Sequence, residues 1–169
     1  MLNQITIKVT KGHQNALIGY AYAQDAGADI VCLDKFTLSP GQRLLVPTGL
    51  RFQLPLGVEA QIRSKSGVAM KGVIVLNSPG TIDSGYTGEI KILLMNVGDE
   101  WVSFEARQKI AQVVFARHLT AVFDFSGEKL WEAQSNKRGE GGFGSTGSKI
   151  SSEEESKWMF PPFNEIAEY

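Results

Sequence analysis

The sequence predicts an all-β fold, a β-sandwich of the jelly-roll type in a single domain. Short apolar stretches recur along the chain, separated by Gly- and Pro-containing turns at roughly the 8–12 residue spacing of β-sandwiches. Several of these stretches alternate apolar and polar residues, which is the period of a half-buried strand. The chain has 169 residues, 43% of them hydrophobic and 21% charged, which suits one domain with a full core.

The strands are expected in order along the chain. Residues 5–9 (ITIKV) alternate, and residues 43–64 hold two strand-like runs around the turns PTG and LPLG. Residues 89–97 (EIKILLMNV) alternate again, and residues 109–125 are rich in β-branched and aromatic side chains. One short helix is expected after SKSG, over residues 68–72.

Composition excludes several classes of function. The formal net charge is −1, so the chain as a whole does not attract nucleic acid or an anionic membrane. Its cations are spread out rather than interleaved with aromatic residues, which disfavours a nucleic-acid-binding barrel. The lone Cys32 is expected to be a small core residue, with a catalytic thiol as the alternative. The N-terminal residues lack a signal-peptide pattern and no apolar run is long enough for a bilayer, so a cytoplasmic location is expected.

Four parts are predicted along the chain. The β core spans residues 1–125, a polar connector 126–137, a Gly-rich segment 138–147 and a tail 148–169. The tail combines an acidic run with aromatic residues and is expected to be flexible. The alternative is that its large apolar side chains dock on a neighbouring molecule; these are Trp158, Met159, Phe160 and Phe163.

The Gly-rich segment, RGEGGFGSTG, has a composition suited to binding phosphate. It formally matches G-x-G-x-x-G, but no apolar strand precedes it and too little chain follows for a dinucleotide fold. Its residues are also in the wrong order for a P-loop. We therefore expect its bare amides, with Arg138, Ser145 and Thr146, to wrap an anion, while Phe143 caps a flat ring. The alternative is a flexible linker with one anchoring Phe.

Three further stretches carry candidate chemistry. Residues 77–89 (NSPGTIDSGYTGE) predict a β-hairpin with a wide loop and Asp83 near its tip, suited to orienting a water as general base. An Asx-turn aspartate is the alternative. Residues 63–67 (RSKSG) group cations and hydroxyls into a candidate oxyanion site, or else form a solvated turn. Asp29, in AGADI, suits a water-mediated Mg²⁺ contact.

Together these segments resemble the trimeric dUTPase family. The matching stretches follow the family's order: AGADI with PGQRLLVPTGL, RSKSGVAMKG, NSPGTIDSGYTGEIK, KIAQVVF and RGEGGFGSTG. The resemblance implies a jelly-roll homotrimer with swapped C-terminal arms. It also implies hydrolysis of dUTP to dUMP and pyrophosphate with Mg²⁺, which limits uracil in DNA and supplies dUMP for dTMP synthesis. The Gly-rich segment would be the flap that closes over a neighbouring subunit's site.

The resemblance also implies a role for each matching residue. Asp83 would orient the attacking water, Tyr86 would pack under the deoxyribose, and Asp29 would hold the metal through water. The uracil would be bound by Asn77, Gly80, Thr81, Ile82 and Lys91. The phosphates would be bound by Lys65, Ser66, Gly67 and Gln112, with Arg63 and Ser64 as further contacts. From the flap, Phe143 would stack on uracil, while Arg138, Gly144, Ser145 and Thr146 would complete the substrate site near the γ-phosphate.

The chain also departs from the family pattern. Lys65 stands where the family has Arg, so the phosphate role is open between Lys65 and Arg63. Residues 107–109 (RQK) replace Gly-Asp/Glu-Arg, which puts the usual ion pairing there in doubt. The connector and tail are longer than usual, which leaves open a regulatory protein-binding role, as in phage members of the family. A dCTP deaminase is disfavoured because Leu93 stands where that enzyme needs a proton-carrying Glu.

Overall fold

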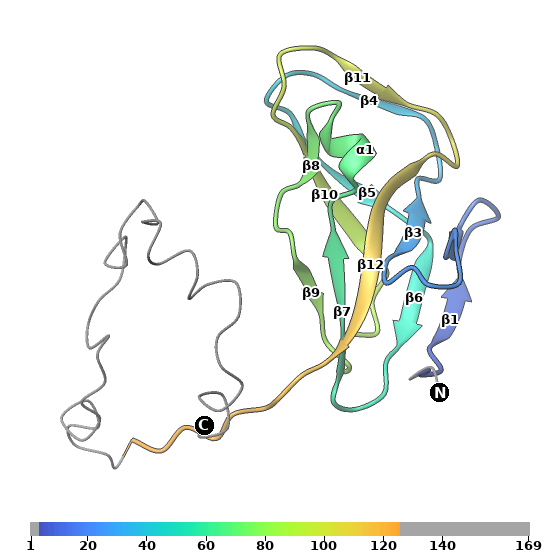
Figure 1. Ribbon diagram of the computed structural model, residues 1–169. Coiled ribbons are helices and arrows are strands. Elements are labelled where there is room, and N and C mark those ends of the chain that lie inside the picture. Colours follow the sequence, from blue (N-terminus) through green and yellow to red (C-terminus); the bar gives the residue numbers. More distant parts are fainter. Residues whose placement is uncertain (1–3, 126–169) are drawn as a thin grey trace, which may run out of the picture. The chain divides into compact units, whose positions relative to one another are not determined.

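The computed structural model describes residues 4–125, and their fold is built almost entirely of strands (Figure 1). The elements in chain order are β1 Lys8–Lys11, β2 Ile18–Gly19, β3 Ala28–Val31, β4 Phe36–Leu38, β5 Arg43–Pro47, β6 Leu50–Gln53, β7 Val58–Arg63, α1 Ser66–Ala69, β8 Val73–Val75, β9 Gly80–Ile82, β10 Lys91–Asn96, β11 Val102–Phe104 and β12 Lys109–Arg117. The predicted all-β jelly-roll class is confirmed. No helix in residues 4–125 has the length and hydropathy that crossing a membrane requires.

Long-range antiparallel pairing organises the strands into sheets. The largest sheet has the order β2-β3-β12-β7-β9, and a three-stranded sheet has the order β5-β10-β8. Two further pairs, β1-β6 and β11-β4, complete the described strands. In Figure 1 the long β12 runs between β3 and β7. Residues distant in sequence therefore become neighbours on one surface of the largest sheet.

The core lies between the inner faces of these sheets. Along β7, Val58, Ala60 and Ile62 are buried while the residues between them are less so, as the alternation predicts. Along β10 the same alternation buries Ile92 and Leu94. Truncating a large buried residue of this core to Ala would be expected to destabilise the fold by about 2–5 kcal/mol.

Residues 43–64 form three strands, where the sequence predicted two. Both predicted turns are present, and together they divide the segment into β5, β6 and β7. Gly49 and Gly57 occupy these turns with φ of 65° and 76°, a left-handed conformation that glycine adopts without a Cβ clash. The prediction failed because two turns inside one apolar stretch require three runs rather than two.

The predicted hairpin around residues 77–89 is present, but its loop contains another strand. The flanking strands β8 and β10 pair antiparallel, with Val75 opposite Leu94. Between them, β9 crosses to the largest sheet and pairs with β7, placing Ile82 opposite Ala60. Asp83 and Tyr86 therefore follow an edge strand of the largest sheet rather than a simple hairpin tip.

The structure also bears on the predictions for Cys32, for the short helix and for the end of the β core. Cys32 is fully buried and its Sγ donates a hydrogen bond to the Glu105 carbonyl at 3.0 Å, which fits the predicted core role. Burial raises the pKa of this thiol, which disfavours the catalytic alternative. The short helix α1 forms two residues earlier than expected, and the compact unit ends at Ala121, near the predicted limit at 125. The connector, the Gly-rich segment and the tail lie outside the described residues.

Candidate active site

A row of three polar side chains crosses the outer face of the largest sheet. Gln112 on β12 is directly opposite Asp29 on one side and Arg63 on the other. Directly opposed residues of antiparallel strands point to the same face. Their chain neighbours Ile30 and Ile62 are buried in the core, so the three polar side chains point outward.

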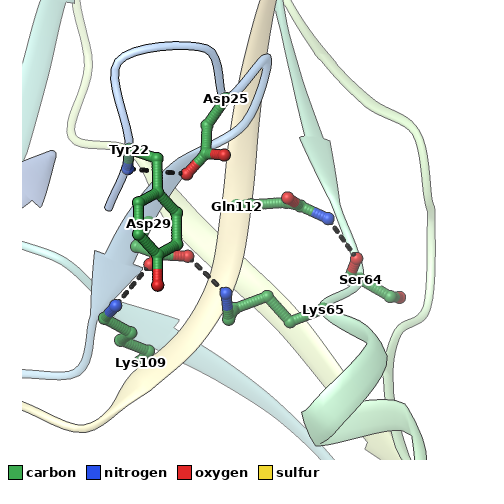
Figure 2. Close-up of polar contacts among 7 residues, drawn as sticks. All are labelled: Tyr22, Asp25, Asp29, Ser64, Lys65, Lys109 and Gln112. Atoms are coloured by element: carbon green, nitrogen blue, oxygen red, sulfur yellow. Dashed lines mark hydrogen bonds and ion pairs between the residues drawn. The ribbon is translucent and has the colours of Figure 1, made fainter. Parts of the chain in front are cut away.

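Asp29 is the most buried member of this row and carries two ion pairs (Figure 2). Lys65 Nζ lies 2.5 Å from its Oδ1, and Lys109 Nζ lies 2.6 Å from its Oδ2. The Asp29 side chain is only 9% exposed, whereas those of Lys65 and Lys109 are 29% and 53% exposed. A buried carboxylate between two cations is thus the electrostatic centre of the site.

The pKa of Asp29 reflects a competition between burial and its partners. Burial raises the pKa, but the hydrogen bonds from Lys109 and Lys65 and their charges outweigh it and hold the pKa below its ordinary value. The same contact with Asp29 raises the pKa of Lys109. Asp29 is therefore ionised at neutral pH.

The structure separates the two cations that the sequence left as alternatives. Arg63 bonds through its guanidinium to Gln61 Oε1, at 3.2 and 2.5 Å, on its own strand. Lys65 instead ends the β7–α1 loop in an extended conformation and reaches Asp29. Ser66 and Gly67 follow it as the first residues of α1. Lys65, and not Arg63, is therefore the cation that contacts Asp29.

Gln112 and Ser64 connect this loop to the sheet. Gln112 Nε2 donates to the Ser64 carbonyl at 2.9 Å, and Ser64 Oγ accepts from Val75 N–H at 2.9 Å. The Gln112 amide lies over Gly27, where any added Cβ would clash with it. Ser64 is therefore engaged within the chain, through its hydroxyl and its carbonyl.

The loop after β9 carries the candidate catalytic aspartate. Asp83 is exposed, and no hydrogen bond to its carboxylate is found among the described residues. The turn is closed by the backbone instead, with Tyr86 N–H donating to the Asp83 carbonyl at 3.0 Å. The Asx-turn alternative therefore does not describe the Asp83 side chain.

Two side chains in this region lie over glycines. A Cβ at Gly80 would be 3.0 Å from Asn77 Nδ2, so the Asn77 amide lies close over β9. The Tyr86 ring lies against Gly88, and its hydroxyl donates to the Glu89 carbonyl at 2.9 Å. Asn77 and Tyr86 thus each occupy space that a side chain at Gly80 or Gly88 would need.

The candidate residues form two adjoining groups. Lys65 and Gln112 lie next to Asp29, and Ser66 and Gly67 follow Lys65 in α1. Asn77, Gly80, Thr81, Ile82, Asp83 and Tyr86 lie on and around β9. The groups are joined by the β7–β9 pairing and by a 3.4 Å hydrogen bond from Ser64 N–H to Ser78 Oγ. Lys91 begins β10 in the other sheet. The flap candidates 138 and 143–146 lie outside the described residues.

Lys109 is the residue whose role sequence reasoning did not find. The replacement of the usual motif at residues 107–109 put its ion pairing in doubt, yet Lys109 makes an ion pair with Asp29. Arg107 in the same turn has a φ of 66°, a conformation that favours glycine. Gly27 and Gly88 were also missed. The only sequence signal for these two positions is a glycine beside a motif. Such a glycine does not indicate which side chain packs against it.

The donor set around Asp29 fits a metal contact through water rather than direct ligation. A carboxylate offers about four lone-pair positions, so each oxygen that bonds one lysine retains room for a water. Mg²⁺ commonly keeps several waters and uses one or two carboxylates together with substrate phosphates. Among residues 4–125 no group of three or more potential His, Cys, Asp or Glu ligands is present.

Comparison with known proteins shows extended similarity. The dUTPase family profile matches residues 13–147. The deoxyuridine 5'-triphosphate nucleotidohydrolase of Clostridium novyi (strain NT) is 47% identical over 141 residues, which cover 82% of this chain and 96% of the relative. That of Wolinella succinogenes is 45% identical over 151 residues, covering 86% and 97%.

Solved structures agree with the sequence relatives. The dUTPase of Staphylococcus bacteriophage 80alpha with dUPNHPP is similar with a TM-score of 0.76 at 25% identity, over 85% of this chain and 99% of that one. A mutant dUTPase from phage phi11 of S. aureus, described as coordinating a structural Mg(II) ion, has a TM-score of 0.67 at 22% identity over 73% and 98%. The profile covers well over half of the sequence, and both curated relatives exceed 40% identity. The chain therefore belongs to the dUTPase family of enzymes, the deoxyuridine 5'-triphosphate nucleotidohydrolases.

Proposed function

We propose that Asp83 orients a water for in-line attack on the α-phosphorus of dUTP, releasing dUMP and pyrophosphate. The observation that carries this assignment is the exposed Asp83 carboxylate, which accepts no hydrogen bond from residues 4–125 and follows the edge strand β9. A carboxylate without other partners is available to accept a proton from water. A rigid sheet behind it restricts its position, which in-line attack requires.

Binding of uracil is proposed to use the free edge of β9. Because β9 is the last strand of its sheet, the backbone groups that face away from β7 are not used in the ladder. Gly80, Thr81 and Ile82 can therefore offer donors and acceptors to a base edge, with Asn77 alongside and Lys91 contributing its backbone. Fixed backbone partners discriminate strongly between bases, since the wrong base leaves them unpaired.

The remaining contacts follow from the two groups of residues. Tyr86 would pack against the deoxyribose and leave no room for a 2′-hydroxyl. Lys65, Ser66, Gly67 and Gln112 would bind the phosphates, since Lys65 and Gln112 lie next to Asp29 and Ser66 and Gly67 follow Lys65 in the chain. From a neighbouring subunit's flap, Phe143 would stack on uracil, while Arg138, Gly144, Ser145 and Thr146 would hold the γ-phosphate end. Closing such a flap excludes bulk water during reaction.

Mg²⁺ is proposed as the cofactor, held by Asp29 through water. The fit of Asp29 to a water-mediated contact supports this assignment, and the phage phi11 dUTPase is described as coordinating a structural Mg(II) ion. When bound to the triphosphate, the ion would neutralise charge on the leaving pyrophosphate.

A homotrimer with swapped arms is proposed as the assembly. The outward face of β5-β10-β8 has an apolar centre, where Leu45 lies opposite Leu93 and Met95 lies opposite Ile74, with the cations Arg43 and Lys91 on the same face. Leu45 is 54% exposed in the single chain, which a subunit contact would cover. A cavity of about 810 Å³, lined by apolar residues such as Ile5, Val9 and Phe115 and by polar ones such as Asp25 and Arg117, is where a neighbour's arm would dock. The enzyme is proposed to act in the cytoplasm, limiting uracil in DNA and supplying dUMP for dTMP synthesis.

Two alternative functions remain from the sequence, a dCTP deaminase and a regulatory protein-binding role. Leu93 lies on the outward face of β10, opposite Leu45. Its aliphatic side chain has no proton to exchange, and this supports a diphosphatase over a deaminase. A regulatory protein-binding role depends on residues 116–137 and on the tail, of which residues 126–137 and the tail lie outside the described residues, and it stays a prediction.

The test is release of pyrophosphate from dUTP, dCTP, dTTP and UTP with Mg²⁺ at equal protein concentration. Rapid release from dUTP alone is expected. Absence of release from dUTP, or similar rates for all four nucleotides, would overturn the proposal.

A further inference from the structure

The ammonium of Lys65 already donates to Asp29, so a nucleotide phosphate would compete with that carboxylate for it. Lys65 Nζ lies 2.5 Å from Asp29 Oδ1, inside the most buried part of the site. We propose that Lys65 is an exchange residue, which leaves Asp29 for the phosphates when a metal–nucleotide complex binds. Asp29 Oδ1 then accepts a hydrogen bond from a metal-bound water in its place. The inference rests on the proposed phosphate role of Lys65.

Lys109 is what makes the exchange energetically reasonable. Removing the partner of a buried charge usually destabilises strongly, because the charge remains without compensation. Here Lys109 Nζ stays 2.6 Å from Asp29 Oδ2 when Lys65 departs. The pair left behind is neutral, whereas the arrangement with both lysines carries one excess positive charge. Asp29 therefore never becomes an isolated buried anion.

Of the two lysines, Lys65 is the one that lies in a loop. Lys109 begins β12, the central strand of the largest sheet. Lys65 lies in the loop between β7 and α1, and its side chain makes no capping hydrogen bond to the helix. A compact ammonium on a four-carbon stem can turn between two acceptors without a change of backbone, which a bidentate Arg clamp would do less readily. Figure 2 shows Lys65 reaching Asp29 from outside the strand that carries it.

The exchange couples nucleotide binding to the divalent cation. A nucleotide without metal would draw Lys65 from Asp29 and bring no donor to Oδ1 in its place. A nucleotide with metal supplies that replacement as a bound water. Because coupling is reciprocal, the cation and the nucleotide raise each other's affinity. Asp29 thus acts as a competitor of metal-free nucleotide for Lys65.

The first test measures binding of the imido analogue of dUTP in EDTA by calorimetry, using the full chain. Asp29→Asn should bind the metal-free analogue about tenfold more tightly than the unmodified protein, because the competitor is removed. Asp25→Asn is the matched control. This substitution removes the same charge nearby, but the Asp25 carboxylate accepts from Tyr22 N–H and does not contact Lys65. Unchanged affinity in Asp29→Asn, or an equal gain in both variants, would overturn the proposal.

The second test does not depend on Asp29→Asn folding. Mn²⁺ binding without nucleotide is measured from the electron paramagnetic resonance signal of the free ion. Lys65→Met should raise Mn²⁺ affinity by removing the ammonium that occupies one lone pair of Oδ1, and Arg63→Met, which removes a charge bonded to Gln61, should raise it less. Equal effects would show that charge alone matters and would refute the exchange. Failure of the unmodified protein to release pyrophosphate from dUTP would instead refute the proposed function, and the Mn²⁺ result would still stand.

Discussion

The phenol ring of Tyr86 occupies the space that a side chain at Gly88 would need. A Cβ built on Gly88 would lie 2.5 Å from Tyr86 Cζ and 3.0 Å from Cε2, well inside the normal contact distance. The ring is also held by the hydrogen bond from its hydroxyl to the Glu89 carbonyl at 2.9 Å. Gly88 therefore sets the position of the residue proposed to exclude a 2′-hydroxyl.

Gly88→Ala should lower discrimination between dUTP and UTP. The new methyl would displace the half-exposed Tyr86 ring rather than unfold the core, because Tyr86 is 45% exposed and can move. A misplaced positioning group can cost on the order of 10²-fold in rate. The measurement is kcat/KM for both nucleotides. Gly85→Ala is the control, since a Cβ there meets nothing within 4 Å. An unchanged dUTP to UTP ratio in Gly88→Ala would show that Gly88 does not set sugar selectivity.

Asp83→Asn should remove turnover while leaving nucleotide binding nearly intact. The amide has the same shape as the carboxylate but cannot accept a proton from water, and general-base catalysis contributes about 10²–10⁴-fold. Single-turnover hydrolysis of dUTP and calorimetric binding of its imido analogue separate the two effects. Turnover within a few-fold of the unmodified enzyme would contradict the assignment of Asp83 as the base.

Arg107→Gly should stabilise the fold by about 0.5–1 kcal/mol. Arg107 has a φ of 66° in the turn before β12, and a left-handed residue with a Cβ carries a penalty of about 1–2 kcal/mol, part of which the extra chain entropy of glycine offsets. The turn is held to Cys32 by hydrogen bonds of 2.9 and 3.0 Å, so it cannot relax freely. Urea unfolding at fixed protein concentration measures the change. Arg107→Ala keeps the Cβ and its left-handed penalty, so it should not raise the free energy of unfolding. Equal gains in both variants would show that removal of the Arg107 charge, and not the backbone conformation, causes the stabilisation.

The Asp29 ion pairs should make stability fall at acid pH. The pKa of Asp29 in the folded protein lies below its ordinary value of 3.8, so the folded state binds fewer protons there than the unfolded state. This contribution is fully present above pH 3.8 and is lost as pH falls through the lowered pKa. The difference in unfolding free energy between the unmodified protein and Asp29→Asn should therefore narrow below about pH 4. A difference that stays constant from pH 6 to pH 2 would contradict this linkage.

Much of the fold was predictable because its signals are local. Alternation in β7 and β10, together with the turn glycines, marks each strand from a few consecutive residues. The failures also have local causes: residues 43–64 contain two turns in one apolar stretch, and β9 is only three residues long. A strand that short carries too few positions for alternation to identify it.

The candidate site was predictable only in part. The residue types of its motifs indicated phosphate and water chemistry, and the family resemblance implied their roles. The link between Lys109 and Asp29 was not predictable, because the usual motif is replaced at residues 107–109 and no local pattern states which carboxylate a lysine reaches.

The sequence by itself determined the all-β class, the position of several strands and the chemical character of each motif, since propensity, alternation and turn chemistry act over short stretches. Only the tertiary structure decided that β12 lies between β3 and β7, which brings Gln112 between Asp29 and Arg63. It likewise decided that two lysines share one buried carboxylate, and that Tyr86 lies on Gly88. These relationships depend on which distant strands pair, and that is settled by burial of the whole core rather than by any single segment.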